Sequence, residues 1–382
     1  MVPKIESRLP DTGTSIFALM SKMALESGAI NLSQGFPDFR IDENLINLVY
    51  KYMLEGHNQY APMPGVLSLR EAIADVVLKT YNRTVNPETE VTITAGATEA
   101  IFAAIAAFVK PGEEVIVFDP SYDSYEPAIR LNGGIPVHIN LTYPGFSVDW
   151  KLVESRINNR TRVIIVNTPH NPSGSIFSET DIRQLETLAI RHNLLVISDE
   201  VYERLVYDQV THRSVLSSPG LASRSIAIFS FGKTFHATGW KCGYAIAPPL
   251  LSHEIRKTHQ FIVFSVNTPL QWALSEYMRE STHFSGLAAF FQKKRDFFLN
   301  NLKGSSFEAL PCHGSYFQVL SYSNISKKTD MEMAEELTKK AKVASIPLSV
   351  FYKDKTDNRL LRFCFAKKEE TLERACEILR KM

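Results

Sequence analysis

Short apolar runs alternate with helix-like segments through the middle of the chain. The apolar runs predict strands at Val91–Thr94, Val115–Phe118, Arg162–Val166, Leu194–Ile197 and Ser225–Phe229. Helices are predicted between them at Gly96–Phe108, at Tyr122–Leu131, which ends at Gly133, and at Ser178–Arg191. Nearly continuous apolar strands are typical of a sheet that helices cover on both faces. The alternation therefore predicts an α/β fold with a mostly parallel, doubly wound sheet.

The pattern changes towards both ends of the chain. Near the N-terminus, Thr14 is predicted to cap a helix that Gly28 ends. Ser68–Glu71 has the form of a capping box and predicts a helix that runs towards Tyr81.

Helical segments dominate from about residue 250 to Asn301, with an amphipathic stretch from Leu287. The last part mixes predicted strands with predicted helices, at Tyr316–Leu320, Leu360–Phe365, Met331–Val343 and Glu369–Met382. We therefore expect an N-terminal arm and helix over residues 1–40, which join the small domain. A large domain is expected over residues 41–285 and a small C-terminal α+β domain over residues 286–382.

Composition and charge exclude several classes of protein. A chain of 382 residues suits a large domain plus a smaller one. A net charge of +1 favours neither nucleic acid nor an anionic membrane as a partner. The charged N-terminus, Met1–Arg8, has no apolar core of a signal peptide, and no run of about 20 apolar residues could span a membrane.

The four cysteines are scattered, without the spacing of metal ligands or of paired disulfides: Cys242, Cys312, Cys364 and Cys376. Three of them lie in apolar stretches and are expected to be reduced core residues. We expect a cytoplasmic protein without a metal site.

Four residues that can contact a ligand follow predicted strands: Gly96, Asn171, Asp199 and Lys233. Ligands of doubly wound folds bind beyond the carboxyl ends of the strands, so the four are expected to share a site. Gly96 opens a helix whose free amides attract an anion, although it is equally an ordinary helix start. Asn171 stands in a proline-rich loop, where it is either a turn residue or an amide donor to a ligand.

Lys233 lies in the stretch Ser230–Lys241, just past an apolar strand. Its amine could bond an aldehyde, while the Ser230 hydroxyl and the second cation, Lys241, could hold a phosphate. The aldehyde that carries a phosphate is pyridoxal 5'-phosphate. Taken alone, Lys233 would also suit a solvated loop, so the rest of the chain has to support this interpretation.

Asp199 follows an apolar strand, where a partly buried carboxylate needs a partner. A protonated pyridine nitrogen is such a partner, and the ion pair would keep the ring able to accept electrons. Asp199 could instead cap a helix. Tyr202 lies three residues further on and could face the same site, or be a half-buried aromatic residue.

Over its full length the chain resembles the fold-type I, class I/II aminotransferases that use pyridoxal phosphate. It is most similar to the branch that holds kynurenine/glutamine aminotransferases and bacterial methionine aminotransferases. The residues that carry the resemblance are Gln34–Phe39, Asn58–Pro62, Thr94–Ala100, Asp119–Tyr125, the Asn171 loop, the Asp199 and Lys233 motifs, and Arg362–Ala366.

The resemblance implies a role for each matching position around the cofactor. Lys233 bonds the aldehyde and then moves the proton, and Asp199 pairs with the pyridine nitrogen. Asn171 and Tyr202 hold the ring oxygen, and Tyr122 stacks on the ring. The phosphate is held by the helix start at Gly96, Ala97 and Thr98, by Ser230 and Lys241, and by Tyr60 from the other subunit of a homodimer.

For the substrate, the resemblance implies that Arg362 binds the α-carboxylate in a bidentate fork, with Asn171 and Gly35 close by. Relatives specific for dicarboxylates use a second arginine. The stretch expected to align with it, Phe261–Asn267, contains none. An acidic side chain would then be left unpaired, so neutral substrates are predicted, with methionine and aromatic amino acids favoured. His170 and His236 lie near these motifs and are given no role.

The predicted function is a ping-pong transamination between an amino acid and a 2-oxo acid. A kynurenine/glutamine aminotransferase and a C–S β-lyase on the same cofactor are the alternatives. A regulator that only senses the cofactor is disfavoured because the family pattern begins within the first 40 residues, which leaves no room for a DNA-binding module.

Overall fold

The computed structural model describes residues 5–280 and 282–382, so the first four residues of the predicted arm lie outside it. Its largest element is a seven-stranded sheet with the order β2-β8-β7-β6-β5-β3-β4. All strands run parallel except β8, which is antiparallel to β2 and β7. The strands are β2 (Val91–Thr94), β3 (Glu114–Asp119), β4 (Ile135–Asn140), β5 (Thr161–Asn167), β6 (Leu195–Asp199), β7 (Ser225–Ser230) and β8 (Gly243–Ile246).

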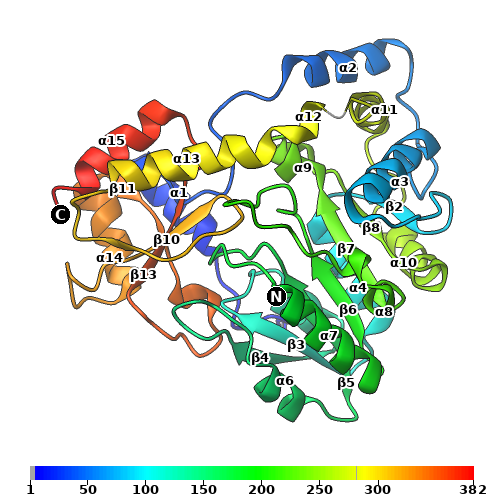
Figure 1. The fold of residues 1–382 in the computed structure, drawn as a ribbon, viewed down its shortest axis with the longest axis horizontal. Coiled ribbons are helices and arrows are strands. Elements are labelled where there is room, and N and C mark those ends of the chain that lie inside the picture. Colours follow the sequence, from blue (N-terminus) through cyan, green and yellow to red (C-terminus); the bar gives the residue numbers. More distant parts are fainter. Residues whose placement is uncertain (1–4, 281) are drawn as a thin grey trace.

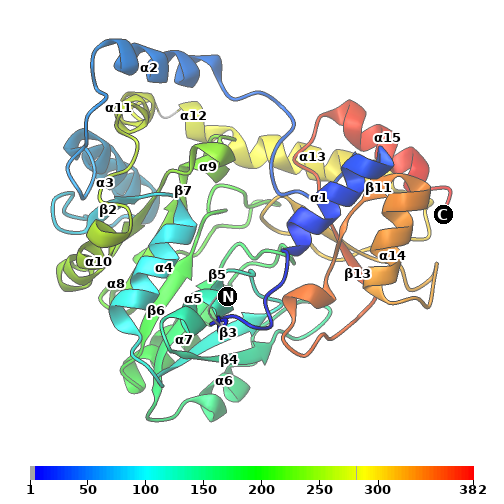
Figure 2. The same ribbon diagram turned by 180° about the vertical axis from the view of Figure 1, so that it is seen from behind.

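Helices cover both faces of this sheet, as Figures 1 and 2 show from opposite sides. One face packs against α4 (Ala97–Phe108), α5 (Tyr125–Leu131) and α10 (Pro249–Ile262) in an alanine- and isoleucine-rich core. The other face packs against α6 (Trp150–Arg156), α7 (Glu179–Arg191) and α8 (Pro219–Ala222). The predicted doubly wound α/β fold is thus confirmed.

A second apolar core joins the two ends of the chain. It lies around a four-stranded antiparallel sheet with the order β12-β13-β10-β9 and a parallel pair of β1 with β11. Figure 2 shows α1 beside α14 and α15. The elements are α1 (Ile16–Ser27), β1 (Ile30–Asn31), α13 (Leu287–Asn301), β9 (Glu308–Ala309), β10 (Phe317–Ser321), α14 (Asp330–Glu336), β11 (Val343–Ala344), β12 (Ile346–Pro347), β13 (Leu360–Cys364) and α15 (Glu369–Leu379).

This packing supports the division into residues 1–40, 41–285 and 286–382, which stays a prediction. The remaining helices are α2 (Glu43–Leu54), α3 (Leu67–Tyr81), α9 (Phe231–Thr234), α11 (Thr268–Tyr277) and α12 (Thr282–Ser285). Within the described residues, no helix is long and apolar enough to cross a membrane.

Several local predictions were wrong. The Ser68 capping box does not form, because α3 begins at Leu67 and the Ser68 hydroxyl is buried inside its first turn without a hydrogen-bond partner. The cap of α1 is Ser15 rather than Thr14. The helix predicted to reach Val343 ends earlier, and Val343 pairs with Ile30 in a strand.

Candidate active site

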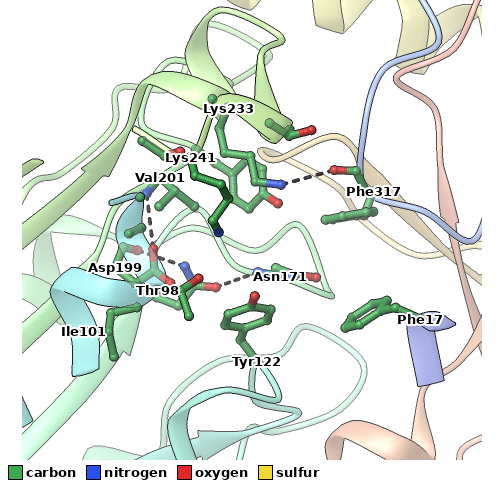
Figure 3. Close-up of a pocket in the computed structure, with 18 of the residues that line it drawn as sticks. Phe17, Thr98, Ile101, Tyr122, Asn171, Asp199, Val201, Lys233, Lys241 and Phe317 are labelled. Atoms are coloured by element: carbon green, nitrogen blue, oxygen red, sulfur yellow. Dashed lines mark hydrogen bonds between the residues drawn. The ribbon is translucent and has the colours of Figure 1, made fainter. Parts of the chain in front are cut away.

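A cavity of about 240 Å³ lies at the carboxyl ends of β5, β6 and β7, where they face the second core. Figure 3 shows Lys233 entering it from one side and Tyr122 and Phe17 from the opposite side. Every predicted site residue except Tyr60 lines this cavity: Gly35, Gly96, Ala97, Thr98, Tyr122, Asn171, Asp199, Tyr202, Ser230, Lys233, Lys241 and Arg362. The fold therefore brings together residues as far apart in the sequence as Gly35 and Arg362.

One end of the cavity is formed by the start of α4. Gly96 precedes the helix with φ 79° and ψ 169°, a conformation that glycine adopts almost alone. The amides of the first helical turn have no partner inside the helix and point outward from it. A Cβ on Gly96 would lie 3.5 Å from Lys241 Nζ, so the amides and the ammonium are close neighbours. Together they form a site for an anion.

Asp199 ends β6 and is 4% exposed. Its Oδ2 accepts a hydrogen bond of 2.6 Å from the Tyr125 hydroxyl, and its Oδ1 accepts one of 3.4 Å from the Val201 amide. Burial raises the pKa of Asp199 to about 6. A cation beside this carboxylate would offset the cost of burial, which suits a protonated nitrogen.

Lys233 lies in the short helix α9 directly after β7. Its Nζ donates to the Gly35 carbonyl at 3.1 Å and to the Tyr316 hydroxyl at 2.8 Å. Loss of hydration lowers the pKa of Lys233 to about 8, because it disfavours the ammonium form. A larger fraction of the amine is therefore neutral near neutral pH than for an ordinary lysine, and the neutral amine can act as a nucleophile or base.

Arg362 lies on β13 with 1% of its surface exposed. It donates to Asn171 Oδ1 at 2.9 Å and to the Ser33 carbonyl at 2.8 Å. Its guanidinium lies 3.9 Å from the centre of the Phe317 ring and 5.2 Å from that of Phe17. Burial lowers its pKa to about 10, which still leaves it charged at neutral pH. A charged guanidinium among aromatic rings can bind a carboxylate ligand through two charge-assisted hydrogen bonds.

Comparison with known proteins identifies the family. The model of the family "Aminotransferase class I and II" matches residues 27–379. The chain belongs to this aminotransferase family. Class I and II aminotransferases use pyridoxal 5'-phosphate, so the predicted cofactor is confirmed with the predicted enzyme class.

Relatives of this aminotransferase cover nearly its whole length. It is 49% identical to the methionine aminotransferase of Escherichia coli, over 99% of this chain and 98% of that protein. It is 33% identical to kynurenine–oxoglutarate transaminase 3 of mouse, over 99% of this chain and 90% of the relative. The solved structure of E. coli YbdL, described as having a methionine aminotransferase function, matches with a TM-score of 0.98, 49% identity and full coverage of both chains.

The residues around the cavity of the aminotransferase fit its cofactor. The anion site at α4 suits a phosphate, the buried Asp199 suits the ring nitrogen, and the amine of Lys233 suits the aldehyde. The hydroxyl of Tyr202 is buried, and burial raises its pKa well above the ordinary value, so the phenol stays protonated and can donate to a ring oxygen.

Tyr60 does not line this cavity. It is 81% exposed on a loop beside Trp272 and packs edge-on against Phe264, with ring centres 5.2 Å apart. Within one chain Tyr60 lines a different hollow from the residues of the anion site. Its predicted role thus depends on a second subunit.

Sequence reasoning missed several residues of the aminotransferase site. Phe17, Gln34, Asn167 and Phe317 line the cavity, and Tyr125 holds Asp199. Tyr125 opens α5 three residues after Tyr122, and this short spacing between two tyrosines is a signal that could have been used. The buried His170 donates to or accepts from the Ser173 hydroxyl at 2.6 Å and does not line the cavity.

Proposed function

We propose that this aminotransferase moves the amino group of a neutral amino acid, with methionine and aromatic side chains favoured, to a 2-oxo acid. The observation that carries the proposal is the lining of the cavity. Among the described residues Arg362 supplies its only guanidinium, and the rings of Phe17, Tyr122 and Phe317 also line it. One guanidinium suits one carboxylate, and an acidic side chain would lie unpaired against rings.

The names of the relatives support a neutral donor but do not decide it. Methionine and kynurenine stand in the names of two relatives. An aspartate aminotransferase of Thermus thermophilus, solved with maleate, also matches, with a TM-score of 0.91 at 28% identity. The fold thus serves acidic and neutral substrates alike, and the choice depends on the side chains around the cavity.

The residues of the cavity divide the chemistry among them. When bound, pyridoxal phosphate supplies an aldehyde carbon and a ring that takes up an electron pair. Lys233 Nζ would hold the cofactor covalently and, once released, take a proton from the substrate α-carbon. Asp199 would keep the ring nitrogen protonated, while Asn171 and Tyr202 donate to the ring oxygen. Arg362 would fix the substrate carboxylate and so orient the α-carbon.

We propose a homodimer in which Tyr60 reaches the phosphate site of the partner subunit. The exposure of this tyrosine supports the proposal. So do Phe264, which packs against it and is 48% exposed, and Phe261, three residues before Phe264, which is 86% exposed. Such an aromatic patch is expected at an interface. The stretch Phe261–Asn267, in which no second arginine occurs, lies in the same patch through Phe264. Four buried free thiols further suit a reducing compartment, so we propose the cytoplasm.

Steady-state kinetics with a panel of amino donors and one 2-oxo acid tests the proposal. Methionine and phenylalanine are expected to give parallel lines in double-reciprocal plots and kcat/KM values far above those of aspartate and glutamate. A preference for acidic donors would contradict it. Release of pyruvate and thiol from an S-substituted cysteine, without an acceptor and faster than transamination, would instead identify a β-lyase.

A further inference from the structure

Tyr316 lies behind Lys233, outside the lining of the cavity and fully buried. Its hydroxyl accepts the 2.8 Å hydrogen bond from Lys233 Nζ and itself donates a short hydrogen bond to the Gly35 carbonyl. The same carbonyl accepts the second hydrogen bond of the amine, at 3.1 Å. Lysine, tyrosine and carbonyl therefore form a closed triangle of hydrogen bonds.

The direction of these bonds follows from the protonation of the phenol. Burial raises the pKa of Tyr316 well above its ordinary value, so the hydroxyl keeps its proton. The Tyr316 hydroxyl donates that proton to the Gly35 carbonyl, and its oxygen accepts the hydrogen bond from Lys233 Nζ. A neutral amine has two N–H donors and one lone pair. Both donors are engaged here, so the lone pair is the only position left for a new bond.

The phenol itself is held in place by aromatic packing. Its ring centre lies 5.0 Å from that of Tyr202 and 4.9 Å from that of Phe317, both edge-on, and 6.0 Å from that of Phe291. Close packing on three sides leaves the ring one orientation. The acceptor for Lys233 therefore has a fixed position.

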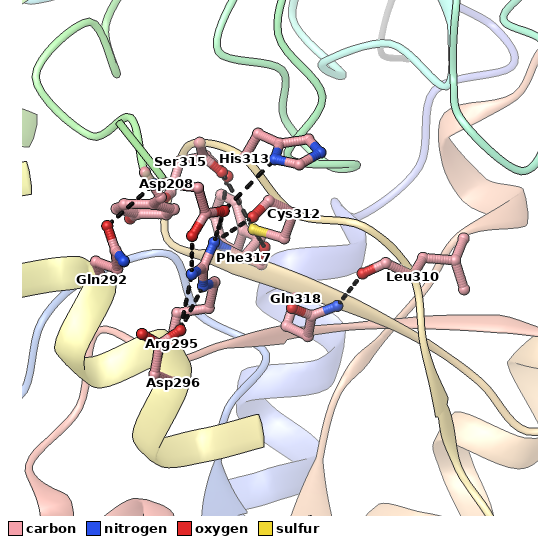
Figure 4. A network of polar contacts seen from close by, with 12 residues as sticks. Asp208, Gln292, Arg295, Asp296, Leu310, Cys312, His313, Ser315, Phe317 and Gln318 are labelled. Carbon is pink, nitrogen blue, oxygen red and sulfur yellow. Dashed lines mark hydrogen bonds and ion pairs between the residues drawn. The ribbon is translucent and has the colours of Figure 1, made fainter. Parts of the chain in front are cut away.

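The loop before Tyr316 is also anchored, as Figure 4 shows. Arg295, which is 7% exposed, donates to both carboxylate oxygens of Asp208 at 2.7 Å and to the Cys312 carbonyl at 2.8 Å. The Ser315 amide donates to the Leu205 carbonyl at 3.0 Å. These bonds tie the loop to the segment that follows Tyr202. They therefore fix Tyr316 relative to Tyr202, which lines the cavity.

We propose that Tyr316 is a positioning residue that orients the released amine of Lys233 towards the substrate α-carbon. This inference rests on the proposed function. In the step concerned, the Nζ lone pair would take the proton of the α-carbon and form a new N–H bond, and the bound cofactor would supply the ring that takes up the C–H electron pair. The Lys233 ammonium would later give up the same proton. Tyr316 and Gly35 hold Nζ at one place during both transfers.

The Tyr316→Phe variant tests this directly because it keeps the packed ring and removes only the hydroxyl. In single-turnover mixing of the cofactor-loaded enzyme with methionine, the rate constant of the spectral change is expected to fall about tenfold, the effect of one lost hydrogen bond. The apparent dissociation constants of methionine and cofactor are expected to stay within about twofold, because Tyr316 contacts neither.

Tyr322→Phe is the matched control. Tyr322 is fully buried in the same core, and its hydroxyl donates to the Lys328 carbonyl at 2.9 Å, away from the cavity. It is expected to leave the rate constant unchanged. An unchanged rate constant in Tyr316→Phe would overturn the inference, and so would an equal loss in both variants.

A crystal structure of the wild-type protein with pyridoxamine phosphate supplies a readout independent of activity, and it serves even if Tyr316→Phe does not fold. Lys233 Nζ is expected within hydrogen-bond distance of both the Tyr316 hydroxyl and the Gly35 carbonyl. An amine that points elsewhere would overturn the inference. Failure of the wild type to convert any neutral amino acid would instead contradict the proposed function, while the position of the amine would still be measured.

Discussion

Burial disfavours the charged form of three side chains that line the cavity: Asp199, Lys233 and Arg362. Burial raises the pKa of Asp199 to about 6, and it lowers the pKa of Lys233 to about 8 and that of Arg362 to about 10. Such shifts cluster at functional sites, because an isolated buried charge is otherwise costly. Each residue type could be predicted from its place after a strand or in a motif. The burial of these three side chains in one cavity could not be predicted, because it depends on packing between segments that are distant in the sequence.

The lowered pKa of Lys233 predicts the pH dependence of cofactor uptake. Only the neutral amine attacks an aldehyde, and its fraction grows as the pH rises through about 8. The rate constant for binding of pyridoxal phosphate to the cofactor-free protein is expected to rise with pH up to about 8 and to level off above it. Stopped-flow absorbance measures it. A rate that keeps rising tenfold per pH unit to about pH 10 would show an ordinary lysine.

Replacement of Arg362 by lysine tests the carboxylate fork. Lysine keeps the charge but loses the planar pair of donors, so kcat/KM for methionine is expected to fall by about 10- to 100-fold. Steady-state kinetics measures this. Arg380→Lys, an exposed position after α15, is the control and is expected to behave as the wild type. If Arg362→Lys had the same kcat/KM as the wild type, Arg362 would not bind the substrate carboxylate.

At the scale of elements, the continuous apolar runs among the strands of the large sheet could be predicted, whereas a half-exposed strand and a short strand that begins with glycine could not. β5 and β6 are continuous apolar runs, and both were found. β4 was missed because it is half-exposed and contains Pro136, which weakens a strand pattern. β8 was missed because it is four residues long and begins with glycine, and its antiparallel direction has no signal in the sequence.

The start of α4 gives a prediction at this scale. In Gly96→Ala, a Cβ in the glycine conformation costs about 1 to 3 kcal/mol and would move the first turn away from Lys241. The affinity for pyridoxal phosphate is expected to fall about tenfold, as measured by absorbance titration of the cofactor-free protein. Gly286→Ala is the matched control, because Gly286 precedes α13 with φ −96° and open space around it. Equal affinity in both variants would contradict the anion site.

On the scale of the whole molecule, two apolar cores meet at the cavity, and its residues come from both. Motifs placed most of these residues in advance, from Gly35 near one end of the chain to Arg362 near the other. Tyr316 and Phe317 were not predicted as site residues, because only the packing of the second core around the segment after β6, which includes Tyr202, brings them to the cavity. Of a cavity that lies between two cores, sequence motifs therefore predict only the lining residues that the motifs themselves contain.

The shared site of the proposed dimer predicts complementation between inactive subunits. Lys233→Ala lacks the reacting amine, and Tyr60→Ala lacks the residue expected at the partner's phosphate. Mixed dimers contain one site with both residues intact, so mixing and reassembly should restore activity above the sum of the two parents. Activity no greater than that sum, with mixed dimers detected by mass spectrometry, would place Tyr60 outside the partner's site.

We expect Lys233 and the residues around it to transaminate neutral amino acids. The most direct measurement is the absorbance of the cofactor-loaded protein after addition of methionine without any 2-oxo acid. The band of the lysine-bound cofactor is expected to be replaced by that of pyridoxamine phosphate, with one 2-oxo acid released per site, while aspartate and glutamate change it far more slowly. An absorbance band that no neutral amino acid alters would contradict transamination of neutral amino acids.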